Sequence, residues 1–177
     1  MKNRGINIKG LCKQIKDDKK KIIWSLKDGV HSITNRNWMI SFEEVPREVR
    51  LVLLSIFGGF PEEGYLLQKT PFSDEPQRSV AVEPLSLNRE MAKQAVRTDF
   101  IHTSSRLDNL RVFKAGDGFV YIKEQFLQAI DPNFGFTNMN SFGEMAPLVF
   151  EDLNYIVLPV RIGKEKDLLT LKELTNE

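Results

Sequence analysis

The chain has 177 residues, of which 41% are hydrophobic and 28% are charged, and its net charge is +1. This composition is that of a globular protein with one sizeable core or two small ones, and it excludes a disordered chain. No apolar run approaches the ~20 residues that a membrane-spanning helix needs, so we expect no membrane partner. Residues 1–7 are polar and basic and Cys12 is the only cysteine, which predicts a cytoplasmic protein without an internal disulfide.

Basic residues are concentrated near the start of the sequence. Between Lys2 and Lys27 there are nine lysines and arginines but only two aspartates, whereas the acidic residues lie mostly later. Because the net charge is only +1, the molecule as a whole is a poor electrostatic target for nucleic acid. Any nucleic-acid-binding surface is therefore expected to involve the N-terminal segment.

Residues 7–16 are predicted to form a helix that begins at the N-cap Asn7. Apolar residues recur there at the spacing of one buried helical stripe. They are Ile8, Leu11, Cys12 and Ile15. Lys9, Lys13 and Lys16 recur on a different face of the same helix and would form a row of ammonium groups.

A β pattern follows this helix. Three strands are predicted, at residues 21–26, 30–34 and 38–42. Asp28-Gly29 is a strong signal for the first hairpin turn. Trp24 and Trp38 lie on neighbouring strands and are predicted to pack in the core or on the sheet face rather than to stack on bases.

The middle of the sequence contains helix signals separated by prolines. Pro46 suits the first turn of a second helix, which Gly58-Gly59 would end. Residues 60–84 contain four prolines and are predicted to be an irregular connection with a short strand at 79–82. Residues 88–96 are predicted to form a third helix capped by Asn88.

A second set of elements is predicted after this region. Strands at 110–114 and 119–121 flank a glycine-containing turn, and a helix is expected over 122–130. Further strands are predicted at 135–137, 147–151 and 155–162. Residues 164–177 are mostly charged and carry leucines at helical spacing, so the tail is predicted to be helical.

Residues 120–162 resemble the last half-domain of the bacterial DNA sliding clamp, the β subunit of DNA polymerase III. In that family an aromatic residue opens a helix, strands follow, and the chain closes on Tyr-x-x-Leu-Pro-Val-Arg. The matching positions are Tyr121, Leu127, Ala129, Ile130, Pro147, Val149, Phe150, Tyr155, Leu158, Pro159, Val160 and Arg161. Residues 8–37 show a weaker similarity to the first half of a clamp domain, ending in Ile33, Thr34 and Asn35.

The resemblance implies an α+β, clamp-like fold of two helix-plus-antiparallel-sheet half-units. These would be residues 1–42 and 110–163, with 43–109 as an inserted helical and irregular region and 164–177 as the tail. A clamp subunit has three such domains, whereas this sequence has room for one and continues about fifteen residues beyond its Pro-Val-Arg. The residues expected inside are Leu11, Ile15, Ile23, Phe126, Leu127, Ile130, Ile156 and Leu158.

The row of lysines is the candidate DNA-binding surface. The pore-lining helices of clamps contact the phosphate backbone without sequence preference, and the resemblance implies the same role here. The candidate residues are Lys9, Lys13, Lys16, Lys19, Lys20 and Lys123. Lys123 is the only basic residue on the second predicted half-unit helix, so that helix is poorly basic. The alternative for the whole set is a solvated helix face.

Four residues align with the peptide-binding groove of clamps. They are Ile156, Leu158, Pro159 and Arg161. The alternative is an ordinary hydrophobic strand that closes a sheet. In clamps a neighbouring domain supplies the other wall of the groove, and no such domain is evident in this sequence.

The sequence contains no recognisable catalytic, metal-binding or nucleotide-binding motif. Cys12 with His31 or His102 could form a nucleophilic site only if the fold brought them together, and Cys12 lies on an apolar helix face where a buried thiol is expected. Two histidines without nearby acidic or cysteine ligands do not form a metal site. We therefore predict no cofactor, no metal and no enzymatic activity, although a site assembled from scattered residues would leave no motif.

The predicted function is that of a non-enzymatic accessory or regulatory protein of DNA replication or repair, from a phage or mobile element. Its partners would be the DNA backbone, replication proteins or a second copy of itself. The alternative is a protein-interaction module that uses the clamp-like scaffold without contacting DNA. Salt dependence distinguishes the two, because binding through phosphate contacts weakens steeply as salt rises.

Overall fold

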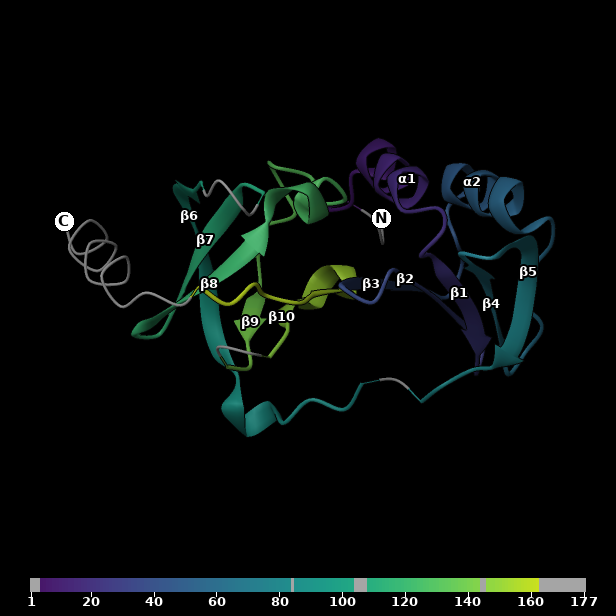
Figure 1. Cartoon of the computed structure of the whole chain (residues 1–177). Coiled ribbons are helices and arrows are strands. Elements are labelled where there is room, and N and C mark those ends of the chain that lie inside the picture. Colours follow the sequence, from purple (N-terminus) through teal and green to yellow (C-terminus); the bar gives the residue numbers. More distant parts are fainter. Residues whose placement is uncertain (1–3, 84, 104–107, 144–145, 163–177) are drawn as a thin grey trace.

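The computed structural model describes residues 4–83, 85–103, 108–143 and 146–162. In this part of the chain two α-helices, α1 (Ile8–Asp17) and α2 (Arg47–Phe57), lie on one face of a single eleven-stranded antiparallel sheet (Figure 1). The fold is therefore α+β, as predicted. No described helix is long and apolar enough to cross a membrane.

The sheet combines strands from the whole chain. Its order is β5-β4-β1-β2-β3-β11-β10-β9-β6-β7-β8. The strands are β1 (Ile23–Lys27), β2 (Val30–Thr34), β3 (Trp38–Phe42), β4 (Tyr65–Thr70), β5 (Ser73–Val80), β6 (Lys93–His102), β7 (Leu110–Ala115), β8 (Gly118–Lys123), β9 (Met139–Ser141), β10 (Leu148–Phe150) and β11 (Tyr155–Val157). Short 3-10 turns are η1 (Arg89–Met91), η2 (Glu124–Leu127) and η3 (Glu151–Leu153).

The N-terminal predictions are confirmed. The Asn7 side chain caps α1 by accepting a hydrogen bond from the backbone N–H of Gly10 at 3.1 Å. Strands β1, β2 and β3 form the predicted meander, and the turn between β1 and β2 uses positive φ angles at Asp28 and Gly29.

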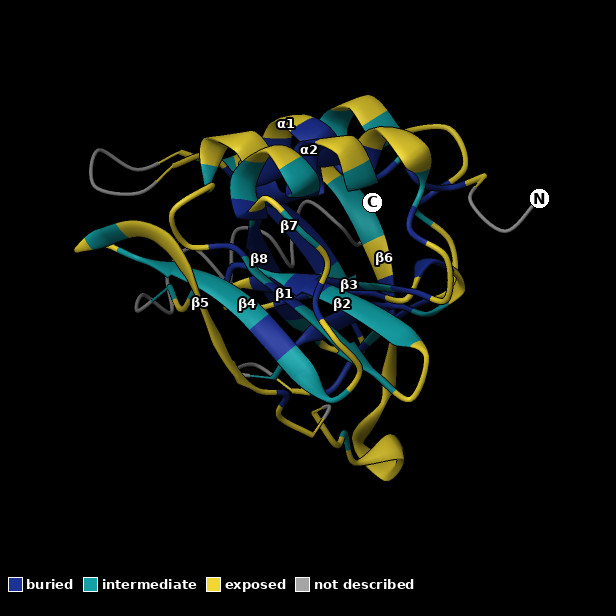
Figure 2. Ribbon diagram, turned by 90° about the vertical axis from the view of Figure 1, so that its right-hand side faces the viewer, coloured by how far each residue is buried: buried dark blue, intermediate teal, exposed yellow. Residues whose placement is uncertain are grey.

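Helix α2 is also confirmed, and it packs beside α1. It ends at Gly58, whose φ of 71° is in the left-handed region that glycine adopts without strain. Its inward residues Val49, Val52 and Leu53 are buried. Figure 2 shows the two helices next to one another, with their outer sides exposed and the residues of the central strands beneath them buried or intermediate.

The prediction of an irregular connection over residues 60–84 is wrong. Most of this segment forms the hairpin of β4 and β5, and β4 pairs with β1. Pro76 lies within β5, which is tolerated because β5 is the edge strand of the sheet and one side of it needs no ladder hydrogen bonds. The predicted strand at 79–82 overlaps only the end of β5.

The helices predicted over 88–96 and 122–130 are also wrong. Asn88 caps only the single turn η1, and the chain then enters β6, which pairs with β7 and β9. In the second case β8 continues through Lys123, so only η2 remains helical. The strands between residues 43 and 109 therefore belong to the same sheet as the rest.

The remaining strands are shorter than predicted or displaced. No strand forms at 135–137, and β9 begins at Met139 instead. Strand β10 lies within the predicted 147–151, while β11 covers only the beginning of the predicted 155–162. The predicted tail helix at 164–177 lies outside the described residues.

Strands β3 and β11 form the junction between the two sets of strands. Tyr155 lies opposite Ile40 and Val157 opposite Trp38, and the Trp38 and Tyr155 rings stack with centroids 6.1 Å apart. The buried Tyr155 hydroxyl donates a hydrogen bond to the Phe126 carbonyl at 2.5 Å and lies 2.9 Å from the Gln14 amide of α1. This network connects α1, β11 and η2.

The core prediction is confirmed for five of its residues, met in part by two and wrong for Leu158. Leu11, Ile15, Phe126, Leu127 and Ile130 are buried. Ile23 and Ile156 are only half-buried, and Leu158 is 39% exposed. Successive strand residues point to opposite faces, and Trp24, Tyr155 and Val157 occupy the helix-covered face. Ile23 and Ile156 therefore point to the other face.

We predict that replacing Tyr155 by Phe lowers the free energy of unfolding by about 1–3 kcal/mol. The buried Gln14 amide and the Phe126 carbonyl would each lose their hydrogen bond to the hydroxyl. Urea denaturation measures the change. Tyr65→Phe, at a half-buried ring in β4, is the matched control and should change the value by less than about 0.5 kcal/mol. Equal effects of the two substitutions would show that the network does not stabilise the junction.

Candidate functional site

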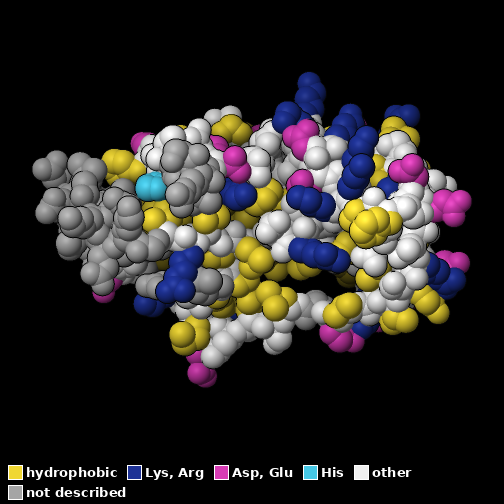
Figure 3. All heavy atoms as spheres, in the orientation of Figure 1, with side chains coloured by type: hydrophobic (Ala, Val, Ile, Leu, Met, Phe, Trp, Pro, Cys, Tyr) yellow, Lys and Arg dark blue, Asp and Glu magenta, His cyan; other side chains and the backbone are white. Residues whose placement is uncertain are grey.

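Five lysines form one exposed surface along α1 and the turn that follows it. We call Lys9, Lys13, Lys16, Lys19 and Lys20 the α1 lysine surface; all five are exposed. The periodicity of α1 explains this arrangement, because its buried stripe of Leu11, Cys12 and Ile15 faces the sheet. Figure 3 shows Lys and Arg side chains gathered over this part of the molecule.

Acidic neighbours neutralise only part of this charge. Lys13 pairs with Asp17 at 2.7 Å, but both side chains are more than half exposed, so the pair contributes at most about 1 kcal/mol. The Asp18 carboxylate accepts a hydrogen bond from the Asn35 side chain at 2.7 Å, which fixes the turn after α1 against the turn between β2 and β3. The lysines thus project from a rigid element.

Lys123 differs from the other predicted DNA contacts. It ends β8, is half-buried, and its ammonium group lies 3.4 Å from Asp108 and 5.9 Å from the centre of the Phe126 ring. The structure therefore brings five of the six predicted lysines onto one helix and turn, and it places the sixth on another element beside a carboxylate.

The four residues predicted to bind a partner lie in and after β11. Ile156 is within β11 and lines a cavity, whereas Leu158 is exposed and its backbone N–H donates to the Asn37 carbonyl. Pro159 is half-buried and Arg161 is exposed. Of the four, Ile156 lines a partly open cavity.

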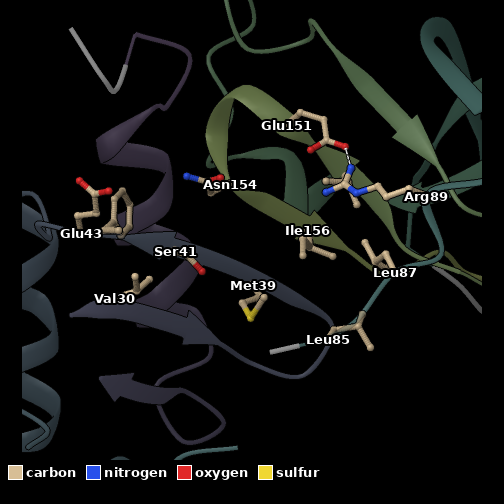
Figure 4. A pocket seen from close by; sticks show the side chains of 12 residues that line it. Val30, Met39, Ser41, Glu43, Leu85, Leu87, Arg89, Glu151, Asn154 and Ile156 are labelled. Carbon is tan, nitrogen blue, oxygen red and sulfur yellow. Dashed lines mark hydrogen bonds and ion pairs between the residues drawn. The ribbon is translucent and has the colours of Figure 1, made fainter. Parts of the chain in front are cut away.

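That space lies between the sheet and the segment that joins β5 to β6. We call this segment, residues 81–83 and 85–92, the strap; it crosses the sheet on the side opposite the helices (Figures 1 and 3). Two adjoining cavities of about 370 and 390 Å³ lie beneath it, and both are lined by Val30, Met39, Ser41 and Leu85. Figure 4 shows the first of them. We call them together the covered cavity.

Sequence reasoning missed the covered cavity. The strap carries Val82, Leu85 and Leu87 in a segment without regular structure, and this run of apolar residues was the available signal. Val82 is 80% exposed and Leu85 58% exposed, so the strap does not pack tightly on the sheet.

An ion pair holds the strap near each end. Glu83 of the strap pairs with Lys27 of β1, and Arg89 of the strap pairs with Glu151, as Figure 4 shows for the second pair. The Arg89 guanidinium also lies over the Phe142 ring, 5.5 Å from its centre.

Burial favours the neutral forms of Cys12, His31 and Tyr155, whereas the buried Arg111 stays charged because Glu124 hydrogen-bonds to its guanidinium group and raises its pKa. Burial raises the pKa of the Cys12 thiol, which disfavours the thiolate that nucleophilic chemistry needs. Burial lowers the pKa of His31, whose Nδ1 accepts a hydrogen bond from Trp24 Nε1 at 3.1 Å. Burial also raises the pKa of the Tyr155 hydroxyl. Among the described residues no group of three or more His, Cys, Asp or Glu side chains could hold a metal ion.

Comparison with known proteins found no match to any family model, any curated protein or any solved structure. Any function assigned to this protein therefore rests on its sequence and its structure.

We predict that acidification destabilises the protein partly through His31. Because the pKa of His31 is lower in the folded state than its ordinary value of 6.5, the unfolded chain binds the proton first, and stability falls as the pH falls below that value. Urea denaturation at pH about 7.5 and about 5.5 measures this loss. His31→Gln keeps an acceptor for Trp24 and should lose less stability; an equal loss would contradict the assignment.

Proposed function

We propose that this protein is a non-enzymatic accessory protein of DNA replication or repair that contacts the phosphate backbone through the α1 lysine surface. The proposal depends on one observation. Five exposed lysines lie on α1 and the turn after it, on the side that faces away from the core. The resemblance of residues 120–162 to a clamp half-domain suggests the same role, but its predicted helix at 122–130 is only the 3-10 turn η2, so the proposal rests on the lysines.

The chemistry of the α1 lysine surface favours backbone contact without base recognition. Each ammonium group is a compact point charge on a flexible stem, so it neutralises a phosphate without the planar geometry that reads a base edge. Binding would be driven by release of counterions and would be weak at physiological salt.

A second candidate, a protein-interaction module without DNA contact, is favoured by one surface feature. Val80 at the end of β5 is 71% exposed, and Val82, two residues further along the chain, is 80% exposed. Exposed apolar side chains mark interaction surfaces when they gather. Association through them would change little with salt, and sedimentation at low and high salt tests this for association with a second copy.

We predict that replacing Lys9, Lys13 and Lys16 together by Gln weakens DNA binding and flattens its salt dependence by up to about two units of log affinity per log salt. Fluorescence titrations with duplex and single-stranded DNA at several salt concentrations measure the slope. The fold should be unchanged, because the three side chains are exposed.

The control is the triple variant Lys69→Gln, Lys93→Gln and Lys114→Gln, which removes the same charge from strands β4, β6 and β7. It should leave the slope nearly unchanged. An equal effect of both variants would show that binding depends on the net charge and not on the α1 lysine surface. Absence of wild-type binding at ~50 mM salt would exclude DNA contact by the isolated protein.

A further inference from the structure

The part of the covered cavity nearest Lys27 is lined mostly by carbon atoms, whereas the part nearest Arg89 is lined about equally by polar and apolar atoms. Three hydroxyls of the cavity floor are already partnered: Ser32 and Ser41 hydrogen-bond to one another at 3.1 Å, and Thr34 donates to the Trp38 carbonyl at 2.6 Å. Between them lie the apolar side chains of Ile23, Val30, Met39, Leu66 and Ile156. A ligand on this floor gains contact with hydrocarbon and finds few hydrogen bonds.

The backbone of the floor is also fully used. Strands β1, β2, β3 and β11 each pair with a neighbouring strand on both sides, so their N–H and C=O groups lie within the sheet. A peptide lying on this floor would leave its own backbone groups without partners there, which is costly. An aliphatic chain has no such groups and meets no such cost.

The two ion pairs of the strap differ in how firmly they are held. The Arg89 side chain is 66% exposed, but it also lies over the Phe142 ring. Glu151 is only 23% exposed at its side chain and accepts a hydrogen bond from Asn140 at 3.3 Å, so additional contacts hold this pair. Glu83 is 81% exposed, whereas its partner Lys27 is only 29% exposed. Glu83 can therefore leave for water at little cost, and Lys27 stays at the rim of the cavity.

We propose that the covered cavity binds a free aliphatic carboxylate. The hydrocarbon chain lies along Val30, Met39 and Ile156 beneath Leu85, and the carboxylate takes the place of Glu83 at the Lys27 ammonium group. The volume fits, because each part of the cavity is within the range of about 300–1,000 Å³ that is usual for small-molecule sites. This site is on the sheet face opposite α1 and is independent of the α1 lysine surface.

Isothermal titration calorimetry of the full chain tests the site, with dodecanoic acid and 1-dodecanol as probes below their aggregation limits. Dodecanoic acid should bind more tightly than 1-dodecanol, and acids shortened by one methylene should each lose about threefold in affinity. Lys27→Gln should weaken dodecanoic acid by about fivefold and leave 1-dodecanol unchanged.

Glu83→Gln gives the sharpest result, because it removes the carboxylate that pairs with Lys27 and should tighten dodecanoic acid several-fold without touching the core, while Asp28 remains at this end of the cavity. Met39→Trp should fill the cavity and abolish binding of both probes. Lys69→Gln on β4, which does not line the cavity, is the control and should change neither affinity.

Three results would overturn the proposal. Failure of dodecanoic acid to bind would remove the site. Equal binding of acid and alcohol, with no effect of Lys27→Gln or Glu83→Gln, would show that no carboxylate is recognised. Unchanged affinity in a folded Met39→Trp variant would place the ligand elsewhere.

Discussion

Strand β3 comes from residues 38–42 and β11 from residues 155–157, yet their antiparallel pairing joins the strands of the two chain ends into one sheet. Tyr155 contacts both sides of this junction. Its ring stacks on Trp38, and its hydroxyl connects Gln14 of α1 with the carbonyl of Phe126. Burying a hydroxyl is favourable only when its hydrogen bonds are made, so α1, β11 and η2 must adopt their positions together.

The same junction determines both candidate sites. Because side chains alternate along a strand, placing Trp38 and Tyr155 against the helices directs Met39 and Ile156 to the opposite face, where the strap covers them. Helix α1 lies over the junction with its apolar stripe inward, so its lysines face solvent. One face of the sheet therefore presents a rigid row of cations, and the other presents a covered apolar floor.

The sequence predicted the elements that local chemistry specifies. Asp28-Gly29 and the alternating residues around it identify the first hairpin, and Pro46 and Gly58 bound α2. It failed where pairing between distant segments decides the structure. The prolines of residues 60–84 suggested an irregular segment, because nothing local shows that β5 is an edge strand. Which face of the sheet the Ile23 and Ile156 side chains point to likewise depends on which of the adjacent strand residues enters the core. Of the candidate sites, the α1 lysine surface follows from helical periodicity, whereas the covered cavity requires the strap to cross the sheet.

Contact between the α1 lysine surface and a phosphate backbone can be located residue by residue. The most direct measurement is an amide NMR spectrum of the full chain, titrated with a short DNA duplex at about 50 mM salt. We expect shift changes in residues 8–21, and in the adjoining turn at Arg36, that disappear as salt is raised. The amides of β9 and β10 should not move. Changes centred on any other element, or no changes at low salt, would contradict the assignment of this surface as the DNA contact.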